Sequence, residues 1–282
     1  MNMEPASSSI GTIDVDRVLR TKNPSLARIV PRFITNYLKR VVHQDEINAF
    51  LLQSGHLHDA ELVAEFLRHF GVKHTVHGNV PQSGRFIFVS NHPLGGLDGV
   101  VFIHELSKHF SDIKFPVNDI LTYIENLNGI FLPVNKHGSQ GRDAAKKIED
   151  AYASGSQILY FPAGLCSRKR KGVIRDLEWH KSFIVKSIQH KRDVVPCYFS
   201  GRNSDFFYNL ANIRKSFGLK ANIEMLYLPD EMFRQKGTEL HLVFGKPIPW
   251  TFFDKSRTPV EWAEWVKSIT YELKSEIPPS VL

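Results

Sequence analysis

The chain has 282 residues, with 36 Lys and Arg against 29 Asp and Glu, so its formal net charge is +7. Hydrophobic residues make up 42% and charged residues 23%, a globular composition that excludes general disorder, collagen and coiled coils. The length allows one large domain or two modest ones. The basic balance favours an anionic partner, which could be nucleic acid, an anionic membrane, an acidic carrier protein or a phosphorylated substrate.

Cysteine content and the N-terminal residues bear on the cellular compartment. Two cysteines, Cys166 and Cys197, are too few for a disulfide framework and suit a reducing compartment. The N-terminus lacks a basic stretch followed by an apolar core, so we expect no secretory signal. No apolar run approaches the roughly 18–20 residues needed to span a bilayer. We therefore expect a protein that is soluble or lies on a membrane surface.

The first eighty residues predict a helical segment. After Asn23-Pro24-Ser25, apolar residues over 26–42 recur at three- and four-residue steps, the period of an amphipathic helix, and Pro31 predicts a break or kink in it. Further helices are expected over 45–57 and 60–70. The first helix either packs on its own domain or, being basic and aromatic, lies in a membrane interface. We therefore divide the chain into a helical segment, 1–80, which the second alternative places at a membrane interface, and a second domain, 81–282.

After Gly71 short apolar runs alternate with longer helical stretches. This alternation predicts an α/β fold with a central, mostly parallel or mixed sheet flanked by helices. The predicted strands cover residues 86–90, 129–134, 157–161, 194–199 and 240–244, and the predicted helices cover 99–109, 139–153, 179–189 and 259–276.

Residues 89–100 contain the most informative motif. An apolar strand ends at Ser90-Asn91, and a glycine-rich turn leads into a predicted helix, so His92 and Asp98 lie where α/β proteins usually place their sites. Histidine is suited to proton transfer near neutral pH, and a carboxylate bonded to its other ring nitrogen would fix the tautomer. The alternative is structural, with Asp98 as a helix cap and His92 as a turn residue.

Four blocks in order resemble the lysophospholipid acyltransferase family, the glycerolipid or PlsC-like acyltransferases, which carry a His-x4-Asp motif in an Asn-His context. Any one block alone would be weak evidence for the family, whereas four blocks in order at suitable spacing are specific evidence for it. The blocks are Asn91-His92 through Asp98, Gly129 through Lys136, Phe161-Pro162-Ala163-Gly164-Leu165-Cys166-Ser167-Arg168, and Val194-Val195-Pro196-Cys197.

Three departures from the family pattern matter. Five residues rather than four separate His92 from Asp98, as in a variant branch of the family, and glycine can absorb the extra residue as a bulge. The basic residue of the second block is Lys136, shifted by one position from the expected arginine. Ala163 replaces the expected glutamate in the block that lines the family's acceptor pocket, which puts the usual glycerol-phosphate grip in question.

The resemblance implies direct acyl transfer from a thioester to a hydroxyl. His92 would act as the general base and Asp98 would orient it, with amides of the glycine turn suited to a developing oxyanion. The acyl donor would be acyl carrier protein or coenzyme A thioester, with no other cofactor and no metal. The implied substrate-binding residues are Asn91, Gly95, Gly96, Lys136, Phe161, Pro162, Gly164, Ser167 and Arg168.

A basic run, 168–171, follows the third block, with Arg175 nearby. It is either a solvated surface or a contact for anionic headgroups, for coenzyme A phosphates or for an acidic acyl carrier protein. Nucleic acid is not expected, because no recognised binding motif accompanies the run. The pairs His56-x-His58 and His74-x-x-His77 lack ligands at metal-site spacing.

We therefore expect a peripheral O-acyltransferase on the cytoplasmic face of the inner membrane. Its acceptor would be a lyso-phospholipid or an acylated amino acid that gives an ornithine- or glycine-type lipid, and Ala163 favours the second. The rival hypothesis is a non-catalytic, membrane-associated lipid-binding protein that keeps the fold.

Overall fold

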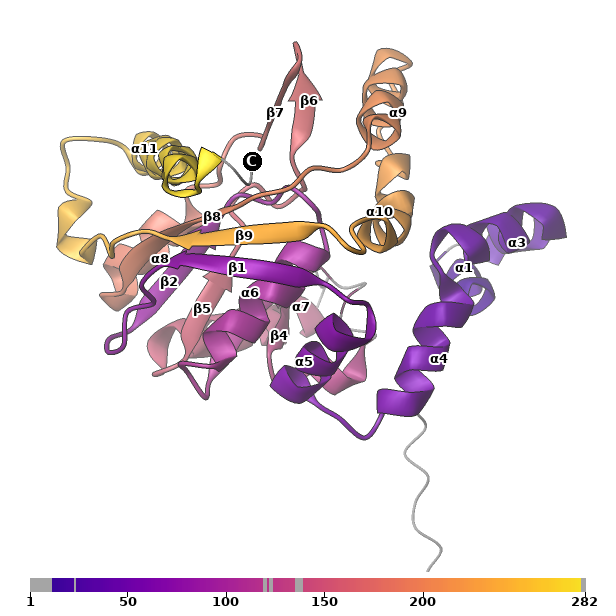
Figure 1. Ribbon diagram of the computed structural model, residues 1–282, viewed down its shortest axis with the longest axis horizontal. Coiled ribbons are helices and arrows are strands. Elements are labelled where there is room, and N and C mark those ends of the chain that lie inside the picture. Colours follow the sequence, from indigo (N-terminus) through magenta and orange to yellow (C-terminus); the bar gives the residue numbers. More distant parts are fainter. Residues whose placement is uncertain (1–11, 23, 119–120, 122–123, 135–138, 280–282) are drawn as a thin grey trace, which may run out of the picture.

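The computed structural model describes residues 12–22, 24–118, 121, 124–134 and 139–279 (Figure 1). The α-helices are α1 (Val15–Lys22), α2 (Pro24–Ile29), α3 (Arg32–Val41), α4 (Gln44–Ser54), α5 (Asp59–His69), α6 (Leu97–Ser107), α7 (Ser139–Ala153), α8 (Ser182–His190), α9 (Asp205–Ser216), α10 (Leu228–Arg234) and α11 (Pro259–Glu272). Short 3-10 helices are η2 (Glu125–Leu127), η3 (Ile223–Tyr227), η4 (Trp250–Phe252) and η5 (Leu273–Glu276). The strands are β1 (Lys73–Gly78), β2 (Phe86–Ser90), β3 (Ile113–Val117), β4 (Phe131–Pro133), β5 (Gln157–Tyr160), β6 (Arg168–Arg170), β7 (Val173–Arg175), β8 (Asp193–Phe199) and β9 (Glu239–Phe244).

A seven-stranded sheet in the order β1-β9-β8-β2-β5-β3-β4 forms the centre of the fold. Strands β8, β2, β5, β3 and β4 run parallel to one another, whereas β9 is antiparallel to β8 and parallel to β1. The predicted α/β fold with a mostly parallel, mixed sheet is therefore confirmed. Because β2 is a central strand, its carboxyl end lies between those of β8 and β5, where the His92 motif begins.

Helices cover both faces of this sheet, and β2 explains why its sequence is apolar throughout. Successive side chains of a strand point to opposite faces. Phe86 and Phe88 pack into one core with α5 and α6, whereas Ile87 and Val89 pack into a second core with α7, α8 and α11. Strands buried on both faces read as continuous hydrophobic runs, and every residue of β2 is buried.

The N-terminal segment differs in part from the prediction. The break at Pro31 is confirmed, because this residue separates α2 from α3. However, the segment is not helical to residue 80, since β1 pairs with β9 at the edge of the sheet. Helices α4 and α5 also contribute buried side chains to the first core. Of the N-terminal helices, as far as the structure describes them, only α1, α2 and α3 contribute no buried residue to this core.

The apolar stripe of α2 and α3 is exposed. The side chains of Ile29 and Phe33 are 75% and 73% exposed, whereas Leu38 and Val41 are half-buried and Tyr37 bonds Tyr227 of η3, so the segment packs on its own domain only in part. Within the described residues, no helix combines the length and the apolar character needed to cross a bilayer.

Several elements were not predicted from the sequence. Strand β3 alternates buried and half-buried residues and is short, and the two-stranded hairpin β6–β7 is built from basic residues with little apolar patterning. Helices α9 and α10 were also missed, although Ser204 caps α9 by accepting the Phe207 N–H.

Candidate active site

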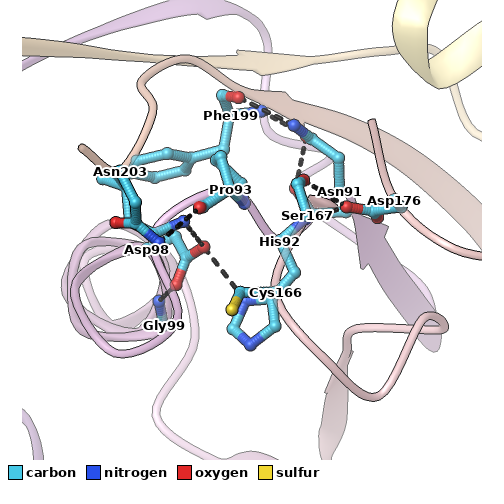
Figure 2. Close-up of polar contacts among 12 residues, drawn as sticks. Asn91, His92, Pro93, Asp98, Gly99, Cys166, Ser167, Asp176, Phe199 and Asn203 are labelled. Carbon is cyan, nitrogen blue, oxygen red and sulfur yellow. Dashed lines mark hydrogen bonds and ion pairs between the residues drawn. The ribbon is translucent and has the colours of Figure 1, made fainter. Parts of the chain in front are cut away.

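His92 and Asp98 lie together at the carboxyl end of β2. His92 Nδ1 is 3.0 Å from Asp98 Oδ2, and the carboxylate is fully buried while 14% of the histidine side chain is exposed. Asp98 belongs to the first turn of α6 and His92 precedes the turn, so the five intervening residues fold back to bring the two side chains into contact (Figure 2). The predicted pair is therefore formed.

Backbone amides hold the Asp98 carboxylate in place. Leu94 N–H donates to Oδ2 and Gly99 N–H donates to Oδ1, each at 3.0 Å. Gly95 makes the tight turn between them, since its φ of +88° is unfavourable for other residues. A Cβ atom at Gly95 would also lie 2.8 Å from the Leu228 side chain of α10, so a larger residue does not fit here.

This geometry defines the state of the imidazole. An ionised carboxylate only accepts hydrogen bonds, so Nδ1 carries the proton and Nε2 of neutral His92 has a free lone pair. Among the residues that the structure describes, none hydrogen-bonds Nε2. Burial lowers the pKa of His92, but the charge and hydrogen bond of Asp98 outweigh burial and raise this pKa above its ordinary value. The arrangement leaves Nε2 able to accept a proton.

Asn91 fixes the strand end that carries His92. Its side-chain Nδ2 donates to Phe199 O at 2.8 Å, and its Oδ1 accepts Phe199 N–H at 2.7 Å. The buried amide thus joins the ends of β2 and β8. We predicted a substrate-binding role for Asn91, whereas its polar side-chain atoms hold the backbone under the histidine.

Asp176 is a site residue that the sequence did not reveal. Its Oδ1 accepts the His92 backbone N–H at 3.2 Å and the Ser167 hydroxyl at 2.6 Å (Figure 2). Its Oδ2 accepts the Trp179 indole N–H at 2.9 Å. Burial raises the pKa of Asp176, and the bonds from Ser167 and Trp179 oppose that rise. Asp176 follows a strand in no recognisable motif, so only the folded chain brings it to His92.

The third block forms a wall beside the imidazole. The Phe161 ring stacks on the His92 ring at a centroid distance of 4.1 Å, and Ser167 N–H donates to His92 O at 2.7 Å. Pro162 O accepts the His180 N–H at 3.0 Å, and Gly164 turns the chain with a φ of +65°. Phe161 and Ser167 therefore contact His92 directly, and Pro162 and Gly164 belong to the same loop, so the substrate-binding role of these four residues stays a prediction. Ala163 is buried in this loop.

Arg168 is the main correction to the predicted site. Its side chain is buried and already engaged, since Nη1 donates to Cys166 O at 2.7 Å and Nη2 donates to Glu224 Oε1 at 3.0 Å. Arg214 Nε donates to the other oxygen of Glu224 at 2.8 Å. Arg168 thus fastens the site loop to η3, and it is not an open contact for substrate or headgroups.

The remainder of the basic run is a hairpin. Lys169 pairs with Asp205 at 2.7 Å, whereas Arg170 and Lys171 are exposed on β6 and the turn before β7. Lys136, the predicted cation of the second block, lies outside the described residues. Gly96, the last predicted binding residue, precedes α6 as its N-cap residue.

Both cysteines are buried packing residues, as predicted, and neither forms a disulfide. Burial raises the pKa of Cys166 to about 11 and holds that of Cys197 well above its ordinary value. Neither thiol is therefore available as a thiolate nucleophile at neutral pH.

A second histidine cluster lies on β1 and α6. His74 Nε2 bonds Glu105 Oε1, with the Lys108 ammonium 2.6 Å from the same oxygen and His104 Nε2 3.9 Å away. Sequence spacing did not indicate this group, because its members come from two elements. Lys108 neutralises the carboxylate, so the cluster is an ion-pair network that links the edge strand to α6.

Comparison with known proteins identifies the family. A family model described as acyltransferase matches residues 17–279. Lyso-glycine lipid O-acyltransferases from Bacteroides thetaiotaomicron and Phocaeicola vulgatus are 51% and 48% identical to the chain over 268 residues, covering 94% of this chain and 98% and 96% of theirs. The crystal structure of the 1-acyl-sn-glycerophosphate acyltransferase PlsC from Thermotoga maritima matches with a TM-score of 0.48 and 17% identity, covering 93% of this chain and 98% of that one. The chain therefore belongs to the acyltransferase family.

Proposed function

We propose that this acyltransferase moves a fatty acyl group from an acyl thioester to the hydroxyl of a lyso-glycine lipid. The chain shares about half of its residues with two lyso-glycine lipid O-acyltransferases, along nearly the whole length of each. One structural observation carries the chemistry, namely the 3.0 Å contact of His92 Nδ1 with the buried Asp98 carboxylate. It leaves Nε2 as the proton acceptor.

The reaction uses His92 twice. Nε2 takes the proton of the acceptor hydroxyl as its oxygen attacks the thioester carbonyl carbon. The new C–O bond forms, the C–S bond breaks, and the imidazolium returns the proton to the leaving sulfur, so that the products are an ester and a free thiol. Asp98 stabilises the imidazolium between the two transfers.

The N-terminus of α6 is suited to the oxyanion of this reaction. The Gly95 and Gly96 N–H groups donate no hydrogen bond within the described residues, and they lie at the positive end of the helix dipole. Unpaired amides at such a place stabilise negative charge that develops on a carbonyl oxygen. We therefore assign the developing oxyanion to the Gly95 and Gly96 amides.

The acceptor differs from a glycerol phosphate in carrying a carboxylate. Ala163 offers no charged group at the family's glutamate position, and Arg168 is paired with Glu224. We therefore assign the acceptor carboxylate to Lys136, whose ammonium is a point charge without the bidentate geometry of arginine. The donor is either acyl carrier protein or coenzyme A thioester, and the enzyme works as a peripheral protein at the cytoplasmic face of the inner membrane.

Product formation tests the proposal directly. Purified protein is incubated with acyl carrier protein or coenzyme A thioester and with lyso-glycine lipid, lyso-ornithine lipid or lysophosphatidic acid, and the lipids are identified by mass spectrometry. We expect diacylated glycine lipid from the wild type and from His56→Gln, which alters an exposed histidine, but none from His92→Gln. Transfer to lysophosphatidic acid alone would refute the acceptor, and binding without transfer to any acceptor would favour a non-catalytic lipid-binding protein.

A further inference from the structure

Exposed apolar side chains gather on two segments that are far apart in the sequence. Of the nineteen large hydrophobic residues that are exposed in the described part of the chain, ten lie on them. We call their surface the docking face. It comprises Ile29, Phe33, Ile34 and Tyr37 on α2 and α3, and Phe206, Ile213, Phe217, Leu219, Ile223 and Leu226 on α9 and the residues up to η3.

The two segments adjoin one another. The hydroxyls of Tyr37 on α3 and Tyr227 on η3 are 2.9 Å apart, and the Phe206 and Tyr227 rings meet edge to face at 5.0 Å. Beyond α3, the His43 ring stacks on Phe233 of α10 at 3.9 Å. In Figure 1, α9 and α10 lie on the side of the molecule that carries the N-terminal helices.

The charge of these segments indicates what covers the docking face. Residues 17–44 contain seven Lys and Arg, residues 206–223 contain three, and neither stretch has an Asp or Glu. Together they exceed the net charge of +7, so the remainder of the chain is net acidic. Lys39 pairs with Asp16 and Arg214 with Glu224, which lie just outside these stretches. Apolar side chains flanked by an excess of cations are typical of surfaces that enter a bilayer of anionic lipids.

Half of these ten cations are free to meet lipid headgroups. Arg28, Arg32, Arg40, Lys215 and Lys220 are exposed, and within the described residues they form no ion pair. A globular protein rarely exposes so many large apolar residues without a partner. A membrane partner accounts for both the apolar groups and the one-sided charge.

Glu224 joins the docking face to the active site. This buried carboxylate binds Arg214 of α9 and Arg168 of the site loop, and Arg214 Nη1 donates to Leu219 O at 2.6 Å. Ser167, next to Arg168, donates its N–H to His92 O. The backbone of Leu219 is therefore linked through Arg214, Glu224 and Arg168 to the loop that bonds His92.

We propose that α2–α3 and the α9–η3 segment form one bilayer-docking face for anionic lipids, in which Phe217 and Leu219 are a second insertion point beside α3. This deepens the peripheral location proposed above. It also explains how a lipid acceptor reaches His92, since the site loop is bonded to the segment that enters the interface.

Vesicle binding tests the second insertion point without any turnover. Wild type, Phe33→Ser, the double variant F217S/L219S and the control Val260→Ser are sedimented with vesicles of phosphatidylcholine alone or mixed with phosphatidylglycerol. Val260 is 52% exposed but lies on α11, away from the docking face. Because burying one large apolar side chain contributes about 1.5–3 kcal/mol, we expect F217S/L219S and Phe33→Ser each to weaken binding by about tenfold or more, with Val260→Ser unchanged.

The outcomes separate the possible partners. Wild-type binding to mixed vesicles should exceed that to phosphatidylcholine, and K215E/K220E should remove much of this difference. If F217S/L219S binds as tightly as wild type, the second insertion point is wrong. If the wild type is instead a dimer in solution that F217S/L219S dissociates, the face belongs to a second copy and the proposal is overturned. Vesicle binding with no acyl transfer to any acceptor would refute the proposed function but leave the docking face standing.

Discussion

Replacing Asp98 by asparagine isolates the electrostatic part of the site. The variant keeps the shape of the side chain but loses its charge. An asparagine that offers its oxygen to His92 and Leu94 must direct its NH2 group at the Gly99 N–H, where two donors clash. The flipped amide avoids that clash but donates to Nδ1, which moves the ring proton to Nε2 and removes the base.

The size of the expected rate loss follows from the distance between the two charges. With Nδ1 and Oδ2 in contact, the two charge centres lie about 4 Å apart, and at an effective dielectric constant near 20 their attraction is about 4 kcal/mol. Since about 1.4 kcal/mol corresponds to a factor of ten, we expect the turnover rate of Asp98→Asn to fall about a thousandfold.

Thiol release from the acyl thioester, in the presence of acceptor, measures this loss. Asp150→Asn on α7 is the matched control, because it removes the same charge from an exposed position and should leave the rate unchanged. Thermal unfolding of both variants shows whether the fold is kept. A folded Asp98→Asn enzyme whose rate falls by less than about tenfold would refute the assignment of this pair as base and orienting carboxylate.

Three further predictions concern the surroundings of the site and the stability of the fold. The charge of Asp176 helps to raise the pKa of His92, and His92 must be neutral to act as a base. Asp176→Asn should therefore move the acidic limb of the pH–rate profile to lower pH. An acidic limb that stays in place would contradict this positioning role of Asp176. Glu224→Gln removes the charge of a buried carboxylate that two arginines share, and it should lower the free energy of unfolding in urea by about 3–5 kcal/mol. An unchanged free energy of unfolding would show that this network is not needed for stability. Burial raises the pKa of Glu105, but hydrogen bonds from its two basic neighbours outweigh burial and lower it to about 2. The ionised carboxylate therefore stabilises the fold above its unfolded pKa of about 4.5, and Glu105→Gln should lower the free energy of unfolding by about 2 kcal/mol at neutral pH. This difference between variant and wild type should disappear as the pH falls from 4.5 towards 2. A difference that does not change with pH would refute the ion-pair assignment.

Local patterns in the sequence were sufficient for five of the seven strands of the central sheet, β2, β4, β5, β8 and β9, and for the His92–Asp98 pair. Strand β2 was predicted with its observed limits, because burial on both faces makes its sequence apolar throughout. The pair was found because both residues flank one strand–turn–helix unit, whose geometry depends on a few neighbouring residues. Helix α7 was likewise predicted at its observed ends.

Features that depend on distant segments were missed. Asp176 reaches His92 only through the hairpin β6–β7, and Arg168 looked like one cation among several until Glu224 was seen beside it. Strand β1 has polar and half-buried residues, because it is an edge strand, so its sequence carries little of the usual strand pattern. In each case the information lies in the pairing of remote residues, which single-sequence periodicity does not contain.

The burial of the two cysteines has a practical consequence for an enzyme whose proposed donor is a thioester. A thiolate exposed near the site would itself accept acyl groups, and the protein would slowly acylate its own side chains. Cys166 and Cys197 are both inaccessible and protonated at neutral pH. The folded protein should therefore give no background with thiol-reactive dyes, so that every equivalent of colour in a continuous assay reports one turnover.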